Sequence, residues 1–159
     1  RDLRMSRGLG DVYKRQTLKD IQTLDAIFSD AFRKIVQNNR ELHRQHIDQL
    51  ASQVVRQIEQ SYADSDLSPT RIADSLGMSS AYLGRIFRES MQTSISQYLN
   101  QTRIRRAEEL LRETEQPVET VAGLVGFSNP KYFYVVFKNI TGQTPLQFRK
   151  AVHSASEKN

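Results

Sequence analysis

A helical pattern that occurs twice, with an offset of 49 or 50 residues, constrains the fold of this chain more than any other feature. The first copy reads Ile72-Ala73…Gly77…Leu83…Phe87-Arg88, and the second reads Val121-Ala122…Gly126…Phe133…Phe137-Lys138. Each copy combines a short amphipathic helix, a corner glycine and a second amphipathic helix, which is the pattern of a helix-turn-helix. The repeat therefore predicts two equivalent helical subdomains.

Residues that begin or end helices set the bounds of the predicted elements. Pro69, Pro117 and Pro130 each stand where a first helical residue is expected, and glycines follow the predicted ends. We expect helices over 69–76, 80–89, 117–124 and 130–139, and a short last helix from Thr144-Pro145. The chain is thus predicted to be all-α.

A longer helix is predicted between the two units, from about residue 94 to residue 113. The apolar residues that keep its helical period are Ile95, Tyr98, Leu99, Ile104, Ala107, Leu110 and Leu111. About 18 helical residues span roughly 27 Å. A rigid linker helix of that length would hold two recognition helices near the spacing of one DNA turn, about 34–36 Å.

Residues 17–60 are predicted to form a helical extension of two amphipathic helices with a break at Asn38-Asn39. The apolar positions are Ile21, Leu24, Phe28, Ile35 and Val36 in the first, and Leu42, Ile47, Leu50, Val54 and Ile58 in the second. The favoured interpretation is a connector to a sensor, receiver or ligand-binding domain expected N-terminal to residue 17. The alternative is a dimerising helical pair or coiled coil, although three clean heptads are not evident.

The first 16 residues differ in character from the rest of the chain. They lack a helical period and end in Asp-Val-Tyr-Lys-Arg-Gln, which resembles a translated adapter end from a sequencing library. The alternative is a disordered basic tail that binds nucleic acid loosely. The segment carries five Lys and Arg and two Asp and Glu, so it supplies most of the formal net charge of +5. The position of the charges is therefore more informative than their sum.

Composition argues against several classes of function. With no cysteine, the chain has no disulfides, no cysteine-based zinc site and no thiol nucleophile. His43 and His46 share a helix face but have no evident third metal ligand, and no glycine-rich phosphate loop is present. No apolar run reaches the ~18 residues of a membrane span, and no secretion signal is visible. We expect a cytoplasmic protein that is not an enzyme and needs no cofactor or metal.

About 100 residues also match the pattern of a known family with its internal spacing. The matching residues are Ile72-Ala73, Leu83, Arg85, Phe87-Arg88, Tyr98-Leu99, Arg103, Ala107, Leu110-Leu111, Val121-Ala122, Val125-Gly126-Phe127, Tyr132-Phe133, Phe137-Lys138, Gly142, Thr144-Pro145 and Arg149. On these residues, the segment 55–152 resembles the DNA-binding domain of AraC/XylS-type transcription regulators. The resemblance implies two helix-turn-helix subdomains bridged by a long helix, and transcription control, most often activation through contact with RNA polymerase. A relative that repairs DNA through metal-bound cysteines is excluded because cysteine is absent.

The outward face of the second helix in each unit supplies the candidate base contacts, because a recognition helix reads base edges from that face. These residues are Ser80, Ala81, Gly84 and Arg85 in the first unit, and Pro130, Lys131, Tyr134 and Val135 in the second. Arg85 is the best candidate, since a guanidinium binds guanine O6 and N7 together. Val135 stands where the family often has Arg or Lys. Val135 is expected to contact a thymine methyl group, or else the second unit reads sequence weakly and contacts mainly the DNA backbone.

Candidate phosphate contacts are hydroxyls near helix starts and cations further along the recognition helices. They are Ser68, Thr70, Arg88, Thr120, Lys138 and Thr144. For Tyr134 two interpretations stay open, a hydroxyl offered to phosphate and an aromatic ring that packs on the linker helix. The acidic residues 108, 109, 113, 115 and 119 are expected to face away from DNA, where they either meet RNA polymerase or keep the domain soluble.

The sequence therefore predicts a sequence-specific DNA-binding transcription regulator. We divide it into a tail or artefact (1–16), a helical connector (17–60), a DNA-binding domain (61–153) and a disordered end (154–159). Within the domain, the first unit is 66–90, the linker helix 94–114 and the second unit 116–150. Expected partners are double-stranded DNA, RNA polymerase and, through upstream regions, a second copy. The alternative function is a dimerisation or protein-interaction module with vestigial DNA affinity.

Overall fold

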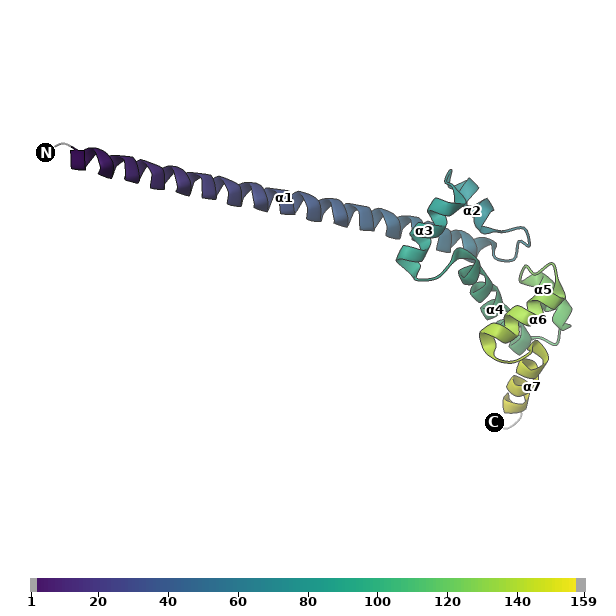
Figure 1. Cartoon of the computed structure of the whole chain (residues 1–159). Helices are drawn as coiled ribbons and strands as arrows, with labels where there is room; N and C mark the ends of the chain where they lie inside the picture. Colours follow the sequence, from purple (N-terminus) through teal and green to yellow (C-terminus); the bar gives the residue numbers. More distant parts are fainter. Residues whose placement is uncertain (1–2, 157–159) are drawn as a thin grey trace. The chain divides into compact units, whose positions relative to one another are not determined.

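The computed structural model describes the backbone of residues 3–156 and the side chains of residues 17–154. The elements in this part of the chain are helices, which confirms the all-α prediction. They are α1 (Leu3–Ser61), α2 (Pro69–Ser75), α3 (Ser80–Met91), α4 (Ile95–Glu113), α5 (Val118–Leu124), α6 (Pro130–Thr141) and α7 (Pro145–Ser156) (Figure 1). Within the described residues, no helix is apolar over a sufficient length to cross a bilayer.

The chain divides into two compact units, one up to His46 and one from Ile47 onward. The first unit contains only the N-terminal part of α1. The second contains the last turns of α1 and all of α2 to α7. Within it, α4 connects the α2–α3 pair to the α5–α6 pair, as Figure 1 shows.

Two features of α1 differ from the sequence prediction. The helix continues through Asn38-Asn39 without a break, because asparagine costs a helix only a few tenths of a kcal/mol and no Gly or Pro accompanies the pair. It also includes residues 3–16, where no helical period was found. The interpretation of residues 1–16 as an adapter remnant stays a prediction.

The C-terminal unit begins earlier than the predicted boundary at residue 61. Ile47 and Leu50 of α1 are buried against Ile86 of α3. The Ser90 hydroxyl also donates to Asp48 across 2.8 Å. The connector prediction missed this because an amphipathic stripe does not show which surface will cover it.

The first subdomain is built from the end of α1, from α2 and α3, and from the start of α4. Its buried core consists of Ala51, Val54, Ile58, Leu67, Ile72, Ala73, Leu83, Phe87, Ile95 and Leu99. Ser68 and Ser79 cap α2 and α3 by accepting from the backbone N–H groups of Arg71 and Tyr82. Gly77 has φ +66°, which permits the tight turn between these helices.

The second subdomain repeats this arrangement with the end of α4, with α5 and α6, and with α7. Its buried core consists of Ile104, Ala107, Leu111, Val118, Val121, Ala122, Val125, Phe127, Phe133, Val136, Phe137 and Phe148. Asn129 caps α6, and Gly142, at φ +80°, follows its end. Pro117 is the residue before α5, with extended ψ of 142°, and not the predicted first helical residue. Residues 154–156 belong to α7 instead of a disordered end, and residues 157–159 lie outside the described residues.

The structural repeat extends beyond the helix-turn-helix pattern seen in the sequence. Ser94 and Gln97 form a capping box at the start of α4, and Thr144 and Gln147 make the matching hydrogen bonds at the start of α7. The helix that precedes each unit also matches, since Ala51, Val54 and Ile58 have the same spacing as Ile104, Ala107 and Leu111. Each subdomain is therefore a four-helix repeat, and α4 belongs to both.

Arg103 of α4 lies at the junction of the two subdomains. Its side chain is buried, with 7% exposed, and it donates from Nε to the Tyr62 carbonyl at 2.8 Å and from Nη2 to the Asp64 carbonyl at 2.7 Å. The guanidinium carbon lies 5.5 Å from the centre of the Phe127 ring in the second subdomain. Burial lowers the pKa of this guanidinium and the negative charge of Asp64 raises it, and the group stays protonated as arginine does in proteins.

Gly126 lies at the same junction, beside Tyr62 and Arg103. Its φ is +91°, and a Cβ placed there would overlap the Tyr62 carbonyl oxygen and would lie 3.0 Å from Arg103 Nε. Only a residue without a side chain fits at this point. The loop after α1 and the turn after α5 can therefore approach one another closely.

Replacing Gly126 with alanine is expected to destabilise the protein by about 2 kcal/mol, since left-handed backbone strain adds to the steric overlap. Gly77→Ala is the matched control, because Gly77 has φ +66° but open space around its Cβ position. That control should cost about 1 kcal/mol, from backbone strain alone. Urea unfolding followed by circular dichroism measures both. Equal losses would show that the contact with Tyr62 and Arg103 contributes nothing.

Candidate nucleic-acid interface

Helix α3 presents a polar, positively charged face to solvent. Leu83, Ile86 and Phe87 are buried and fix the rotation of the helix. The residues that this rotation leaves exposed include Ser80, Ala81, Arg85 and Arg88. The Arg85 guanidinium carbon lies 5.5 Å from the centre of the Tyr82 ring, so the side chain rests on the exposed surface.

Gly84 lies on the same helix and is half-buried. A Cβ added there would meet no heavy atom within 4 Å, so packing within the protein does not require a glycine. In the middle of a helix, glycine costs about 0.5–1 kcal/mol relative to alanine. The small residue therefore opens space on the outer face.

Helix α6 has the same rotation, with Phe133, Val136 and Phe137 buried. Its exposed candidates are Pro130, Lys131, Val135 and Lys138. Val135 is 56% exposed and occupies the position that Arg85 occupies in α3. Helices α3 and α6 thus present the same geometry with different chemistry, a guanidinium in one and an apolar side chain in the other.

Tyr134 lies apart from the other α6 candidates because it packs against the core of the second subdomain. Its ring meets Phe133 edge-on at 6.2 Å. Burial raises the pKa of its hydroxyl, the charge of Glu119 raises it further, and Arg149 lowers it. These charged neighbours belong to α5 and α7, and the core against which the ring packs includes Ile104, Ala107 and Leu111 of the linker helix, so the contacts favour the packing interpretation.

Tyr132 was missed as a site residue by the sequence analysis. It is 52% exposed, and its hydroxyl accepts a hydrogen bond from Asn100 of α4 at 3.4 Å. Together with Val135 and Ile140 it borders a groove of about 370 Å³ between α4 and α6, which Gln97, Asn100 and Gln101 also line. The sequence repeat could have indicated Tyr132, because Tyr82 occupies the matching position in α3.

The predicted phosphate contacts fall into three groups. Ser68 and Thr144 act as helix caps, so their hydroxyls already bond to backbone N–H groups of their own helices. Thr70 and Thr120 are exposed in the first turns of α2 and α5. Arg88 and Lys138 occupy matching exposed positions on α3 and α6, and neither forms an ion pair within the described part of the chain.

Ion pairs neutralise cations on elements other than α3 and α6. Arg71 pairs with Asp64 at 3.2 Å, and Arg105 pairs with Glu59 at 2.7 Å. Arg106 contacts Glu59 at 3.7 Å and Glu109 at 3.0 Å. Among residues 17–154, Arg85, Arg88, Lys131 and Lys138 form no such pair. The accessible charge of α3 and α6 is thus available to an external anion, and a duplex offers a row of phosphates.

Comparison with known proteins agrees with this geometry. Residues 72–151 match the family described as a helix-turn-helix domain. The arabinose operon regulatory protein of Escherichia coli K12 is 32% identical over 111 residues, which are 70% of this chain and 38% of that protein. The C-terminal domain of AraT, a response regulator from Geobacillus stearothermophilus, is 30% identical with a TM-score of 0.63. That match covers 64% of this chain and 84% of the AraT chain.

The fold also matches that of a domain whose crystal structure was determined in complex with DNA. The DNA-binding domain of AdpA, in complex with a target DNA, superposes with a TM-score of 0.64 at 24% identity, over 69% of this chain and 97% of that one. The chain spans between 34% and 38% of the lengths of three curated regulators that it matches. The repeated subdomains, the family match and these relatives establish that the chain belongs to the AraC-type helix-turn-helix family and carries its DNA-binding domain.

Proposed function

We propose that this DNA-binding domain reads a specific duplex sequence with two recognition helices, α3 and α6, inserted into successive turns of one major groove. The observation that carries the proposal is the equivalence of the two helices. Both begin at a side-chain cap and both bury three residues at the same positions, so the same face of each is exposed. The shared helix α4 joins them within one compact unit.

The two helices are proposed to contribute unequally to specificity. On α3, Arg85 would bind guanine through two hydrogen bonds, and Ser80 and Ala81 lie one turn nearer the helix start. On α6, Val135 would contact a thymine methyl group, and Lys131 would reach a base edge or a phosphate. Arg88 and Lys138 would hold phosphates at equivalent places.

Selection of binding sites from a random duplex library by the full chain tests this proposal. Two short enriched motifs about 10 base pairs apart are expected, because one helical turn separates the two contacts. A single motif would show that α6 acts as a backbone clamp. The absence of any enriched sequence would overturn the proposal in favour of an interaction module with vestigial DNA affinity.

Transcription control is proposed to proceed by activation through RNA polymerase. Glu113 and Glu119 are exposed on the second subdomain and form no ion pair within the described residues, so both carboxylates are available for contact with a partner protein. Transcription in vitro from a promoter that carries the selected site is the test. Repression on such a template would contradict activation and leave the DNA-binding proposal intact.

The affinity for duplex is expected to depend steeply on salt. If about six phosphates are contacted, log K should fall with log salt at a slope near −5. Lys138→Ala should reduce the steepness of that slope by about 1 and lower the affinity for all duplex sequences alike. Fluorescence anisotropy across a salt series measures both, with Lys34→Ala on α1 as a control. An unchanged slope for Lys138→Ala would remove this residue from the interface.

A further inference from the structure

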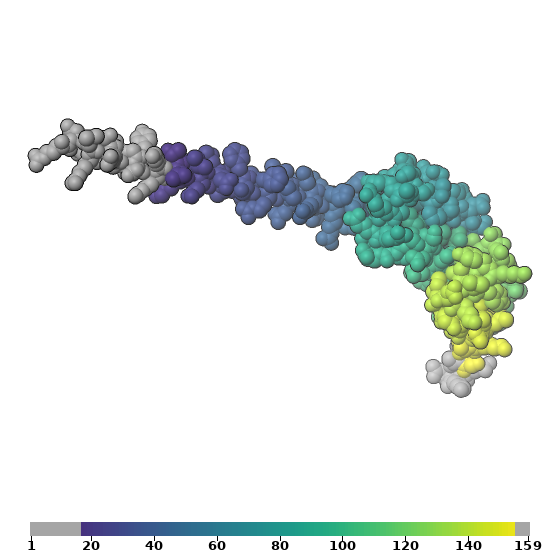
Figure 2. Space-filling view, in the orientation of Figure 1, coloured from purple at the N-terminus to yellow at the C-terminus, as the bar shows by residue number. Residues whose placement is uncertain are grey.

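The N-terminal part of α1 exposes a row of large apolar side chains. Leu18, Ile21, Leu24, Ile27, Phe28, Phe32, Ile35 and Leu42 are each between 54% and 71% exposed. Figure 2 shows this part of the chain as a rod one helix wide. A single helix with this surface buries almost nothing of its own, and most helical stability in proteins comes from packing of an apolar face.

Six of these eight apolar residues follow a seven-residue repeat, and Leu24 and Ile27 lie outside it. Ile21, Phe28, Ile35 and Leu42 are successive members of one heptad position, which is d of a coiled coil. The corresponding a positions hold Leu18, Asp25, Phe32 and Asn39. Because α1 is continuous through Asn38-Asn39, the repeat of Ile21, Phe28 and Ile35 extends to Leu42, which the sequence prediction had assigned to a second helix. A seven-residue apolar period favours a left-handed supercoil with another helix.

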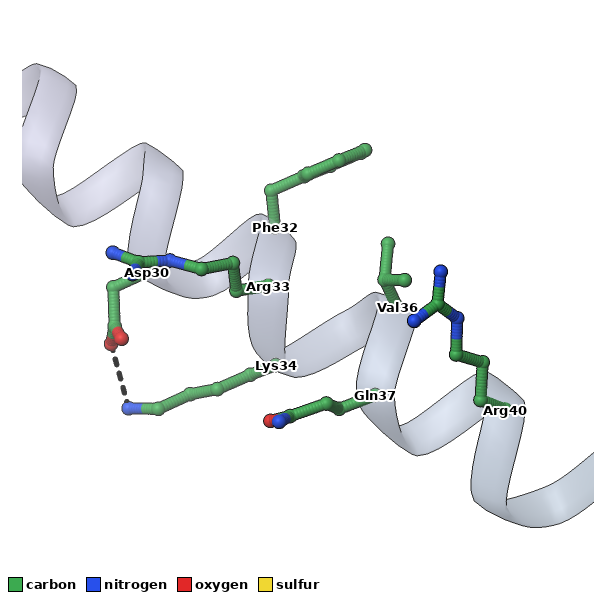
Figure 3. A pocket seen from close by; sticks show the side chains of 7 residues that line it. All are labelled: Asp30, Phe32, Arg33, Lys34, Val36, Gln37 and Arg40. Carbon is green, nitrogen blue, oxygen red and sulfur yellow. Dashed lines mark ion pairs between the residues drawn. The ribbon is translucent and has the colours of Figure 1, made fainter.

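The charged residues of this segment avoid the flanks of the apolar seam. Positions e and g hold Gln22, Leu24, Ser29, Ala31, Val36, Asn38, His43 and Gln45, none of them Lys, Arg, Asp or Glu. Figure 3 shows Phe32 and Val36 on one side of the helix, and the Asp30–Lys34 ion pair with Gln37 on the other. The seven residues drawn there border a shallow depression and all come from this one helix. Two identical copies can therefore approach along the seam without repulsion between e and g charges.

The polar a positions favour one arrangement over the others. In a parallel pair each a residue faces its own copy, so two Asn39 side chains bond to each other, and a buried asparagine of this kind selects two strands in register. In an antiparallel pair a residues face d residues, which would set Asn39 against an aliphatic side chain. Asp25 faces Asp25 in the parallel pair, which weakens it without changing its geometry.

We propose that residues 18–42 of α1 pair with the same segment of a second copy of this chain as a parallel, in-register, two-stranded coiled coil. The apolar seam of each copy is thus covered by the other copy. Parallel pairing places both DNA-binding units after the same end of the coiled coil. The assembled protein would then carry two such units, and its avidity for two sites would exceed that for one.

Cysteine cross-linking tests the arrangement directly, because the natural chain has no cysteine. Ile21→Cys, Ile35→Cys and Leu42→Cys in the full chain should each give a disulfide-linked dimer on mild oxidation. Only a parallel pair in register places all three d positions within disulfide reach of the same positions in the second copy. Gln37→Cys, at the outward f position, is the control and should stay monomeric on a denaturing gel. Cross-linking at only one of the three d positions would overturn the parallel arrangement.

Sedimentation equilibrium of the full chain tests the assembly itself. The natural chain should have twice the mass of one polypeptide. Ile35→Lys should raise the dissociation constant by at least about 100-fold, since each dimer loses two buried aliphatic side chains. Gln37→Lys, with the same added charge on the opposite face, should leave it unchanged, and Asp25→Asn should lower it. A monomeric natural chain, a trimer, or equal effects of the two lysines would overturn the proposal.

Single-site duplex binding separates this inference from the proposed function. Ile35→Lys should keep the natural affinity for one selected site, which shows that its DNA-binding unit is folded. It should lose at least about tenfold in affinity for a duplex with two sites. Failure of the natural chain to bind any duplex would overturn the proposed function alone, because the cross-links do not depend on DNA.

Discussion

Replacing Arg103 with alanine is expected to lower the free energy of unfolding by about 3 kcal/mol or more. The guanidinium donates to two backbone carbonyls, those of Tyr62 and Asp64, at 2.8 and 2.7 Å. Hydrogen bonds to charged groups contribute about 1.5–3 kcal/mol each, and the abandoned carbonyls would lie in a partly buried junction. The alanine also leaves a void beside Phe127.

Arg105→Ala is the matched control for this experiment. Arg105 lies two residues along the same helix and forms an ion pair with Glu59 at 2.7 Å, but its side chain is 54% exposed. Exposed ion pairs contribute about 0–1 kcal/mol, so the control should be nearly neutral. Arg103→Lys should recover part of the loss, because an ammonium retains the charge but not the forked geometry. Urea denaturation measures all three, and equal losses for Arg103 and Arg105 would contradict a junction role.

The same variant should also affect DNA binding in a distinctive way. Arg103 joins the loop after α1 to the turn after α5, so it fixes one recognition unit relative to the other. Its loss should lower the affinity for duplexes that contain both motifs more than the affinity for duplexes that contain one motif. Anisotropy with the two kinds of duplex measures this difference. A uniform loss would show that Arg103 contributes only to folding.

Arg85→Ala is expected to relax sequence discrimination at one base pair by about 1–3 kcal/mol, which corresponds to roughly 5- to 150-fold in affinity ratio. The loss should be confined to the motif read by α3, because Arg85 is exposed on that helix and forms no ion pair in the part of the chain that the structure describes. Stability should change little, since the side chain only rests on the exposed Tyr82 ring.

Repeating the site selection with the Arg85 variant checks this result, and Arg88→Ala serves as the control. Arg88 lies on the same helix at the position that matches Lys138. Its loss should lower the affinity for every duplex without changing the preferred sequence. Val135→Arg offers the converse test, because it places on α6 the side chain that Arg85 places on α3. A new guanine preference in the second motif is expected. An unchanged preference in both variants would remove these positions from base reading.

Most of the DNA-binding fold was predictable because its signals are local. The caps Ser68, Ser79 and Asn129, the turn at Gly77 and the buried triplets of α3 and α6 act within a few residues, so the sequence shows them directly. The predicted bounds of α2 to α6 agree with the structure to within two residues. The interface predictions on α3 followed from the same helical period and stay proposals until DNA binding is measured.

Local patterns failed where two distant segments meet. Tyr134 has the spacing of an outward residue, but neighbours from α5 and α7 turn it into a packing residue. Arg103 looks like one of several arginines on α4, and only the loop 41 residues earlier makes it the buried one. The start of the C-terminal unit was misplaced for the same reason, since Ile47 and Leu50 are covered by Ile86 of α3.

The sequence by itself determined the helices, the turns and the twofold repeat, because capping, glycine conformations and apolar periods operate over one or two turns of chain. Only the tertiary structure decided which apolar stripes are covered by the chain itself. In α1, the stripe from Ile47 onward is buried in the DNA-binding unit, and the stripe up to Leu42 stays exposed. Both have the same helical spacing in the sequence. Burial depends on what packs against a face, and that partner is specified elsewhere in the chain or in another molecule.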